Sequence, residues 1–332
     1  MAEVTPLIRD ELLPPRGPER RHLISITDLT KDDVERLLAL ARTFAASLER
    51  EVKKLPALKG RTVVNVFYES STRTSSSFEL AAKRLSADVM SIKASGSAVD
   101  KGESLKDTAL TIGAYDPDIV VLRHPHIGAP LVVANATTAH VVNAGDGTHQ
   151  HPTQALLDLY TIDEDLGGIA GLHVAIVGDV LHSRVARSDI QALVLMGARV
   201  TVVGPPPLIP RGIEAMGCEV SYDIETIKDA DVVYVLRMQR ERMLEGANYV
   251  PSLREYTARW GVTPGRLRPG QKVMHPGPMN RGVEIDPVVA DAADALIERQ
   301  VRSGLVVRMA VLYDLLTHGP VEVKVAEIEA VA

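Results

Sequence analysis

The feature that most constrains the fold is an alternation of short apolar runs with helical segments, which occurs in two series along the chain. Residues 62–68 form the first apolar run, and after a polar turn a helical pattern covers residues 75–86. The same series contains further predicted strands at 89–93, 118–123 and 140–144, and further predicted helices at 104–115 and 129–136. Such alternation is typical of a parallel sheet flanked by helices, so we expect an α/β fold.

A second series begins near Gly171. Its predicted strands cover residues 173–177, 199–203, 231–236 and 272–275, and its first helix covers residues 185–197. A chain of 332 residues exceeds the size at which a single hydrophobic core usually stops growing. We therefore expect two domains, 1–152 and 153–299, each a parallel sheet flanked by helices, with the substrate cleft between them. The C-terminal segment of about 300–332 is expected to pack back on the first domain through a helix.

Composition excludes several classes of protein. The 37 basic and 43 acidic residues give a net charge of −6, which argues against nucleic-acid binding. No apolar run is long enough to span a membrane, and the N-terminus lacks the apolar core of a secretory signal. The single cysteine, Cys218, cannot form an intrachain disulfide, so we expect a cytoplasmic protein with Cys218 as a buried thiol on a strand.

A cluster of polar residues, Ser71-Thr72-Arg73-Thr74, follows the first predicted strand and precedes a helix. The start of a helix presents backbone N–H groups that suit a phosphate, and an arginine can bind phosphate through two parallel hydrogen bonds. The alternative is an ordinary helix cap. A cap needs only one hydroxyl, however, and it does not account for Arg73.

Two further residues lie at the ends of predicted elements of the same domain. Arg123 ends the strand at 118–123, and His151 opens the helix that follows a glycine-bearing loop. Each could be an ordinary surface residue when it is considered alone. Because polar side chains at the carboxyl ends of parallel strands converge in one crevice, their joint placement favours a common site.

These motifs together resemble the aspartate/ornithine carbamoyltransferase family. The matching residues are Phe67-Tyr68-Glu69-Ser70-Ser71-Thr72-Arg73-Thr74 with Ser77-Phe78-Glu79, then Arg123-His124-Pro125, then His151-Pro152-Thr153-Gln154. The spacing fits from about His22 to Thr317. Several separate motifs in the correct order are more specific than any one of them.

Further segments resemble the aspartate branch of the family rather than the ornithine branch. They are a loop at 97–105 with Lys101, a turn at 178–184 ending in Arg184, the run Arg237-Met238-Gln239-Arg240-Glu241-Arg242, and residues 275–282. Two arginines suit a dicarboxylate and would repel the cationic side chain of ornithine. Taken separately, the run at 237–242 could be a solvated charged surface, and residues 275–278 could be a plain turn. Gly277 departs from the Leu of some family members.

The resemblance implies a role for each matching residue in the transfer of a carbamoyl group from carbamoyl phosphate to L-aspartate. The phosphate is expected to be bound by Ser71, Thr72, Arg73 and Thr74. The carbamoyl oxygen is expected to be polarised by Arg123, His151 and Thr74. The carbamoyl NH2 is expected to be oriented by Gln154 and by the segment Pro276, Gly277 and Pro278. The aspartate carboxylates are expected to be bound by Arg184, Arg237 and Gln239, and Lys101 and Ser97 are expected to reach carbamoyl phosphate, with Lys101 also reaching aspartate.

The resemblance also implies a mechanism without a covalent intermediate, a metal or an organic cofactor. His151 is expected to donate to the carbamoyl oxygen rather than to act as a general base, and the departing phosphate is a plausible proton acceptor. The family forms homotrimers in which Ser97 and Lys101 reach the neighbouring subunit's site. The sequence does not decide whether a regulatory chain or a dihydroorotase partner binds.

Three other functions are alternatives for a chain with this sequence. A related enzyme could carbamoylate ornithine or another amine. A nucleotide-binding oxidoreductase would place a βαβ unit at 173–207, but residues 178–183 lack the GxGxxG spacing and the next strand ends in Gly204-Pro205 rather than an acid. A non-catalytic scaffold would lack Arg73, Arg123 or His151, and all three are present.

Overall fold

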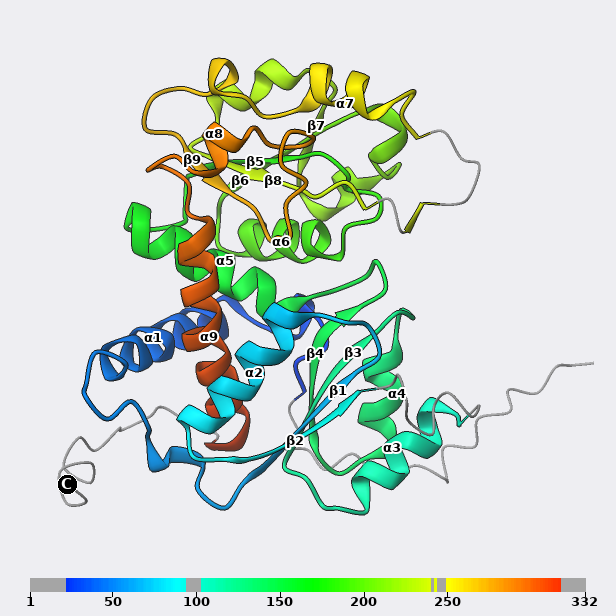
Figure 1. The fold of residues 1–332 in the computed structure, drawn as a ribbon, viewed down its shortest axis with the longest axis vertical. Coiled ribbons are helices and arrows are strands. Elements are labelled where there is room, and N and C mark those ends of the chain that lie inside the picture. The colour runs from blue at the N-terminus through cyan, green and yellow to red at the C-terminus, as the bar shows by residue number, and fades with distance from the viewer. Residues whose placement is uncertain (1–21, 94–102, 240–241, 244–248, 318–332) are drawn as a thin grey trace, which may run out of the picture.

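Two parallel sheets, one above the other in Figure 1, organise the chain. The computed structural model describes residues 22–93, 103–239, 242–243 and 249–317. Within this part of the chain the strand order is β2-β1-β3-β4 in the first sheet and β7-β6-β5-β8-β9 in the second. Every strand pair is parallel, so the predicted α/β fold with two helix-flanked sheets is confirmed.

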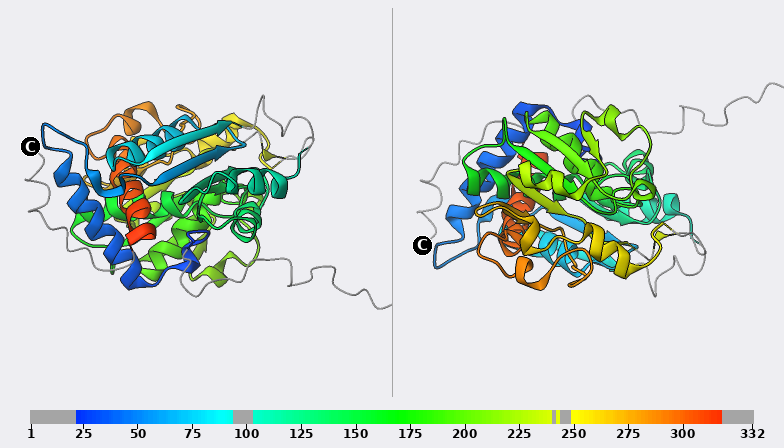
Figure 2. Two further views of the ribbon diagram at one scale, coloured as in Figure 1. Left: turned by 90° about the horizontal axis from the view of Figure 1, so that it is seen from below. Right: turned by 90° about the horizontal axis from the view of Figure 1, so that it is seen from above.

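The first sheet is buried on both faces. Its elements in chain order are β1 (Thr62–Phe67), α2 (Thr72–Arg84), β2 (Asp88–Lys93), α3 (Leu105–Gly113), β3 (Ile119–His124), α4 (Ala129–Ala136) and β4 (His140–Asp146). Alternate residues of a strand point to opposite faces. Val63 and Phe67 therefore enter the main core, whereas Val64 and Val66 pack with Ala109 on α3 and its neighbours on α4. Figure 2 shows this sheet between the two helical layers.

The second sheet follows the same pattern. Its elements are β5 (His173–Val177), α6 (Arg184–Leu195), β6 (Arg199–Val203), β7 (Glu219–Ser221), β8 (Val232–Val235), α7 (Leu253–Trp260), β9 (Lys272–Met274) and α8 (Pro287–Ala290). Short 3-10 helices connect several of them, and the longest in the described part of the chain is Ile224–Asp229 with 6 residues. Val174 and Ile176 face the main core and Ala175 and Val177 face a second cluster, so β5 is buried on both sides.

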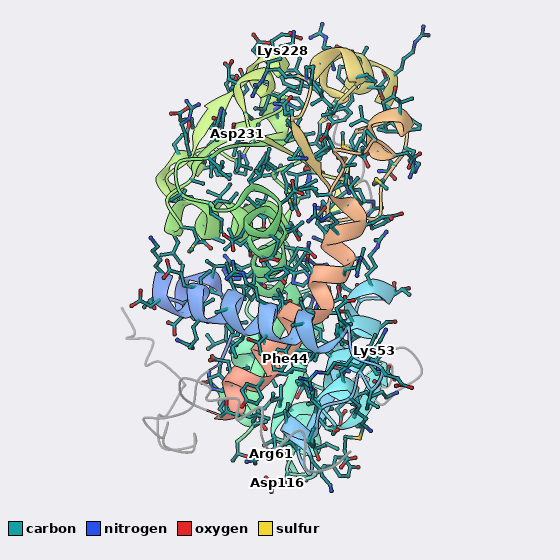
Figure 3. The ribbon with its side chains drawn as sticks, turned by 90° about the vertical axis from the view of Figure 1, so that its left-hand side faces the viewer. Phe44, Lys53, Arg61, Asp116, Lys228 and Asp231 are labelled. Atoms are coloured by element: carbon teal, nitrogen blue, oxygen red, sulfur yellow. The ribbon has the colours of Figure 1, made fainter. Side chains whose placement is uncertain are left out.

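Two helices tie the two sheets together. Helix α5 (Pro152–Leu166) lies between the sheets, and α9 (Ile297–Thr317) runs from the second sheet back to the first (Figure 1). There α9 packs against α2, α5 and α1 (Lys31–Ser47), which begins with a capping box formed by Thr30 and Asp33. Figure 3 shows Phe44 of α1, whose ring meets Tyr313 of α9 edge-on at 5.7 Å.

Two local predictions were wrong. Helix α2 begins at Thr72 rather than 75, so Thr72-Arg73-Thr74 is its first turn and not a polar turn before it. Ser and Thr are weak helix formers because their hydroxyls compete for backbone hydrogen bonds. In the first turn this costs little, since the N–H groups there have no partner within the helix. Cys218 lies one residue before β7 rather than on a strand. It is buried as predicted: its thiol donates to the Ile213 carbonyl, and burial raises its pKa to about 11.

Candidate active site

Functional side chains gather where strands of the first sheet end and where helices of both domains begin. Glu69 follows β1, Arg123 lies near the end of β3, and His151 is the N-cap residue of α5. Arg184 is the first residue of α6 in the second domain, where the Ser183 hydroxyl caps the helix by accepting from the Ala186 N–H. Because parallel strands end at one edge of a sheet, the topology brings these groups to one place.

A carboxylate held by three guanidinium groups forms the centre of this place. Arg184 donates from Nη2 to Oε2 of Glu69 at 2.6 Å, and Arg123 Nε lies 3.3 Å from the same oxygen. Arg242 Nη2 lies 3.4 Å from Oε1. Burial raises the pKa of Glu69, but the charges of Arg184, Arg123 and Arg242 outweigh burial and hold that pKa below its usual value. The three guanidinium groups therefore bind the Glu69 carboxylate, and this cluster joins the two domains.

The loop after β4 brings the guanidinium groups close to the backbone. Arg123 donates to the Ala144 carbonyl at 3.3 Å, and both Arg184 and Arg242 donate to the Gly147 carbonyl, at 3.2 and 2.9 Å. Gly145 has a φ of +117°, and a Cβ there would lie 2.9 Å from Arg184 Nε. Glycine is required at this position because any side chain would displace Arg184.

His151 is buried beside these positive charges. Burial lowers its pKa well below the ordinary value, and the charges of Arg123, Arg184 and Arg308 lower that pKa further. Its backbone N–H donates to Ser188 Oγ on α6 at 2.8 Å, yet neither ring nitrogen has a hydrogen-bond partner among the described residues. His151 is therefore a buried, neutral imidazole whose ring nitrogens are both without a partner among the described residues.

Arg123 experiences the same surroundings. Burial and the charge of Arg184 lower its pKa, whereas the carboxylate of Glu69 raises it, and the result is about 9. Arg123 is thus charged at neutral pH, and it lies in a region where positive charge predominates. Such a site attracts anions and polarises a carbonyl oxygen placed within it.

The first turn of α2 contacts a loop of the second domain. Ser71, the N-cap residue, makes no capping hydrogen bond through its side chain, so the helix-cap alternative for its hydroxyl is wrong. Gly277 has a φ of +60°, and a Cβ there would lie 2.7 Å from Cζ of Arg73. Burial lowers the pKa of His275, Glu284 opposes this, and the charges of Arg73 and Arg237 lower that pKa further. Both guanidinium groups therefore lie near the loop at 275–278.

The structure brings together some of the residues singled out in the sequence. Arg123, His151 and Arg184 lie around one region, Arg73 lies beside Gly277 of the 275–278 loop, and Gln154 is buried. The backbone N–H of Gln239 donates to Asp179 Oδ2 at 3.1 Å. Ser97 and Lys101 lie outside the described residues.

Sequence reasoning missed three charged groups of the site. Glu69 and Arg242 belong to matched motifs but received no role, and Arg308 of α9 was not considered. A carboxylate inside a motif otherwise rich in donors was the available signal for Glu69. Arg308 donates to Ser77 Oγ on α2 at 2.8 Å, a contact 231 positions apart that local patterns do not reveal.

The described residues contain no group of three or more His, Cys, Asp or Glu side chains arranged to hold a metal ion. No helix in the described ranges is long and apolar enough to cross a membrane.

Comparison with known proteins gives consistent matches over both domains. The family model for the carbamoyl-P binding domain of aspartate/ornithine carbamoyltransferase matches residues 21–164, and the model for the Asp/Orn binding domain of the same family matches residues 170–315. The aspartate carbamoyltransferase catalytic subunit of Salinispora arenicola is 58% identical over 303 residues, covering 89% of this chain and 98% of that protein.

Solved structures agree. Aspartate transcarbamoylase from Trypanosoma cruzi in complex with carbamoyl phosphate and aspartate aligns with a TM-score of 0.81 at 31% identity, over 92% of this chain and 100% of the other. The complex of that enzyme with N-(phosphonacetyl)-L-aspartic acid, PALA, gives a TM-score of 0.81 at 31% identity, over 90% and 97%. By sequence and by structure, the chain belongs to the aspartate/ornithine carbamoyltransferase family.

Proposed function

We propose that the chain transfers the carbamoyl group of carbamoyl phosphate to the α-amino group of L-aspartate. The products are N-carbamoyl-L-aspartate and phosphate, in de novo pyrimidine biosynthesis. The observation that carries the proposal is that Arg123 of the first domain and Arg184 of the second bind the same carboxylate oxygen, at 3.3 and 2.6 Å. Groups suited to the two substrates thus meet in one site, and the Trypanosoma cruzi enzyme of the same fold is in complex with both molecules.

The phosphate of carbamoyl phosphate is bound by the first domain, residues 1–152 with the segment at about 300–332, and residues of the second domain complete the site. Ser71, Thr72, Arg73 and Thr74 donate to its phosphate from the start of α2, where the helix dipole also favours an anion. Gln154 and the carbonyls near Pro276 and Gly277 orient the carbamoyl NH2, with Pro278 completing the loop. Each ligand group thus has a matching donor or acceptor.

Aspartate is bound by the second domain, residues 153–299. Arg184, Arg237 and Gln239 hold the two carboxylates and direct the amine at the carbamoyl carbon. Holding two reactants in line can lower a barrier by roughly 7 to 11 kcal/mol, so no covalent intermediate is needed. Selectivity follows because ornithine would bring a second cation toward these guanidinium groups.

The chemical step forms the N–C bond and breaks the bond between the carbamoyl carbon and the phosphate oxygen. Negative charge grows on the carbamoyl oxygen, where Arg123, Thr74 and neutral His151 donate. Each such donor typically lowers the barrier by about 3 kcal/mol. The amine loses a proton and the departing phosphate accepts it, so atoms and charge balance without a protein base.

We further propose a cytoplasmic homotrimer in which Ser97 and Lys101 act in the neighbouring subunit's site. Mixing a Lys101→Ala protein with an Arg123→Ala protein should then restore activity through hybrid trimers that contain some intact sites. Mass spectrometry of the mixture verifies subunit exchange. Activity that stays at the level of the separate variants after exchange contradicts the shared site.

The reaction is tested by product analysis. The purified protein is supplied with carbon-labelled carbamoyl phosphate and either aspartate or ornithine, with Arg123→Ala as the inactive control. Labelled N-carbamoyl-aspartate, and no labelled citrulline, is the expected outcome. Labelled citrulline as the main product would assign a different amine to this site.

A further inference from the structure

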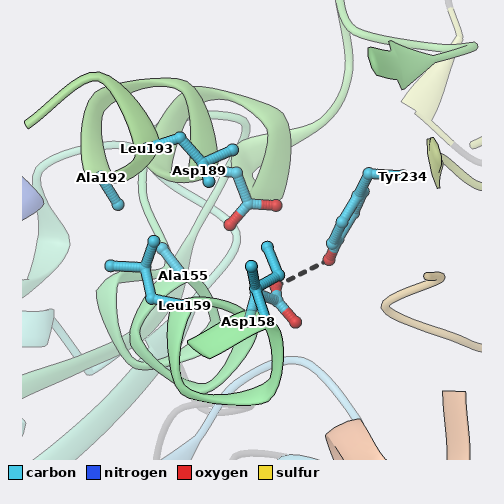
Figure 4. A pocket seen from close by; sticks show the side chains of 8 residues that line it. Ala155, Asp158, Leu159, Asp189, Ala192, Leu193 and Tyr234 are labelled. Carbon is cyan, nitrogen blue, oxygen red and sulfur yellow. Dashed lines mark hydrogen bonds between the residues drawn. The ribbon is translucent and has the colours of Figure 1, made fainter. Parts of the chain in front are cut away.

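A second polar cluster lies behind the site, between α5, α6 and β8. Asp158, Asp189 and Tyr234 are at most 3% exposed, and apolar side chains such as Leu159 and Leu193 surround them (Figure 4). The space between these side chains does not admit a water molecule. Two carboxyl groups in such a place need protein partners or a bound proton.

The two carboxyl groups differ in their partners. Asp158 accepts from the Gln154 amide at 3.1 and 3.2 Å, from the Gln300 amide at 2.7 Å and from the Tyr234 hydroxyl at 2.7 Å. Neither oxygen of Asp189 has a well-aligned hydrogen-bond partner among the described residues, although the Tyr234 hydroxyl lies close enough to lower its pKa slightly against burial. Donors stabilise a carboxylate, so the negative charge resides on Asp158 and the proton on Asp189.

The pKa values follow the same division. Burial raises the pKa of Asp158 to about 7, against the hydrogen bonds from Gln300, Tyr234 and Gln154 and the charge of Arg308. Burial and the neighbouring charge of Asp158 raise the pKa of Asp189 well above its usual value. These are the titratable and charged groups that face the pair.

Asp158 determines which end of the Gln154 amide faces the substrate. A carboxylate accepts but does not donate, so the NH2 end of Gln154 must point to Asp158. The carbonyl oxygen of Gln154 is then the end left to accept a hydrogen bond from a bound molecule. Without the carboxylate, either end of this amide could face the site.

The same carboxylate supports the opposite side of the site. Gln300 donates to Asp158 and accepts from the His275 N–H at 2.9 Å, which anchors the loop at 275–278. Within that loop the Gly277 N–H donates to His275 Nδ1 at 2.8 Å. One buried charge thus fixes both Gln154 and the loop that bears Pro276 and Gly277.

We propose that Asp158 is a positioning residue that aims hydrogen-bond acceptors at the carbamoyl NH2 and so selects carbamoyl phosphate over acyl phosphates that lack an N–H donor. The inference rests on the proposed function. Acetyl phosphate is the matched probe, because a methyl group replaces the NH2 and the rest of the molecule has the same shape. Inorganic phosphate reports the phosphate contacts alone.

The experiment measures the affinities of carbamoyl phosphate, acetyl phosphate and inorganic phosphate by calorimetric titration of the full-length protein. Asp158→Asn replaces one of the two acceptor oxygens that contact the Gln154 NH2 with a donor, so this position no longer fixes which end of the Gln154 amide faces the substrate. We expect the preference for carbamoyl over acetyl phosphate to fall about tenfold, the loss of one hydrogen bond, with phosphate affinity unchanged. Asp189→Asn, the same substitution in the same cluster, should keep the full preference.

Gln300→Leu gives a second route if Asp158→Asn does not fold, because it removes the link between Asp158 and the 275–278 loop and leaves the Asp158 carboxylate with its bonds to Gln154 and Tyr234. Its preference should fall while its phosphate affinity stays. An equal loss of affinity for all three ligands would indicate general disruption and would overturn the inference. An undiminished preference for carbamoyl phosphate in Asp158→Asn would also overturn it. If only Gln300→Leu folds, an undiminished preference in that variant has the same meaning. A wild-type protein without the preference overturns the proposed function as well, so the two failures are distinguishable.

Discussion

At the scale of the residue, burial determines the charge state of the groups in the site. Arg123 and His151 both lie among positive charges, and burial lowers the pKa of each. Arg123 stays charged at neutral pH, whereas His151 is neutral. A neutral imidazole beside a guanidinium can donate to an oxyanion without adding a second positive charge.

The charge state of His151 leads to the first prediction. We expect the imidazole to remain uncharged as the pH falls through 6.5, because burial and the charges of Arg123, Arg184 and Arg308 disfavour the imidazolium. Nuclear magnetic resonance of the labelled imidazole, assigned by comparison with His151→Gln, gives the titration midpoint. A midpoint at 6.5 or above would contradict this description of the site.

Asp189 leads to the second prediction. Its pKa is raised in the folded protein and ordinary, near 3.9, in the unfolded chain, so folding takes up a proton at any pH between these two pKa values. This contribution to stability is complete below pH 3.9 and is lost as the pH rises toward the folded-state pKa, by up to about 1.4 kcal/mol per pH unit. In Asp189→Asn the side chain does not titrate, so this pH-dependent contribution to stability is absent.

Thermal unfolding of both proteins between pH 5 and pH 8 tests this. The Tm of Asp189→Asn relative to the wild type should rise steadily with pH. A Tm difference that does not change with pH would mean that Asp189 is ionised in the folded protein.

Neither charge state could be predicted from the sequence. The motif around His151 indicated a ligand group, but the arginines that lower its pKa come from β3, α6 and α9. The charge state of Asp189 depends on its closeness to Asp158, which arises because α5 packs against α6 and β8. Local patterns do not contain such contacts, because they arise only when distant elements pack.

At the scale of the element, the site depends on where strands end and helices begin. The sequence predicted most of these positions, since apolar runs with polar ends mark strands; residues 173–177 and 199–203 agree with β5 and β6 at both ends. The start of α2 was missed by three residues because hydroxyl-rich segments are equally typical of turns. The error matters, because it places Arg73 on the first turn of the helix.

The contact between α2 and the loop at 275–278 leads to the third prediction. Gly277→Ala should raise the KM for carbamoyl phosphate, because the new Cβ would lie 2.7 Å from Cζ of Arg73 and displace the guanidinium. Steady-state kinetics measure this. The matched control is Gly270→Ala: its φ of +77° gives similar backbone strain, roughly 1 kcal/mol, but a Cβ there meets no atom within 4 Å.

Gly270→Ala should therefore lose similar stability with an unchanged KM. If both variants raise the KM equally, strain alone explains the effect and the contact with Arg73 has no role in binding.

At the scale of the whole molecule, two domains form one site through contacts that cross between them. Glu69 and Gly147 of the first domain bind Arg184 and Arg242 of the second, and His151 is tied to Ser188. Motif order in the sequence indicated which residues share a function. Motif order could not indicate that Glu69 joins the two domains, because the contact between Glu69 and Arg184 spans 115 positions.

The most direct test of this account is the affinity of PALA, which carries a phosphonate and two carboxylates in one molecule, measured by calorimetric titration. Arg73→Ala and Arg184→Ala, one in each domain, should each weaken binding by tenfold or more, the usual effect of losing a charged hydrogen bond. Arg61→Ala is the control, since Arg61 is exposed and pairs with Asp118 at the opposite end of the first sheet. Unchanged PALA affinity in either Arg73→Ala or Arg184→Ala would contradict a single site built from both domains.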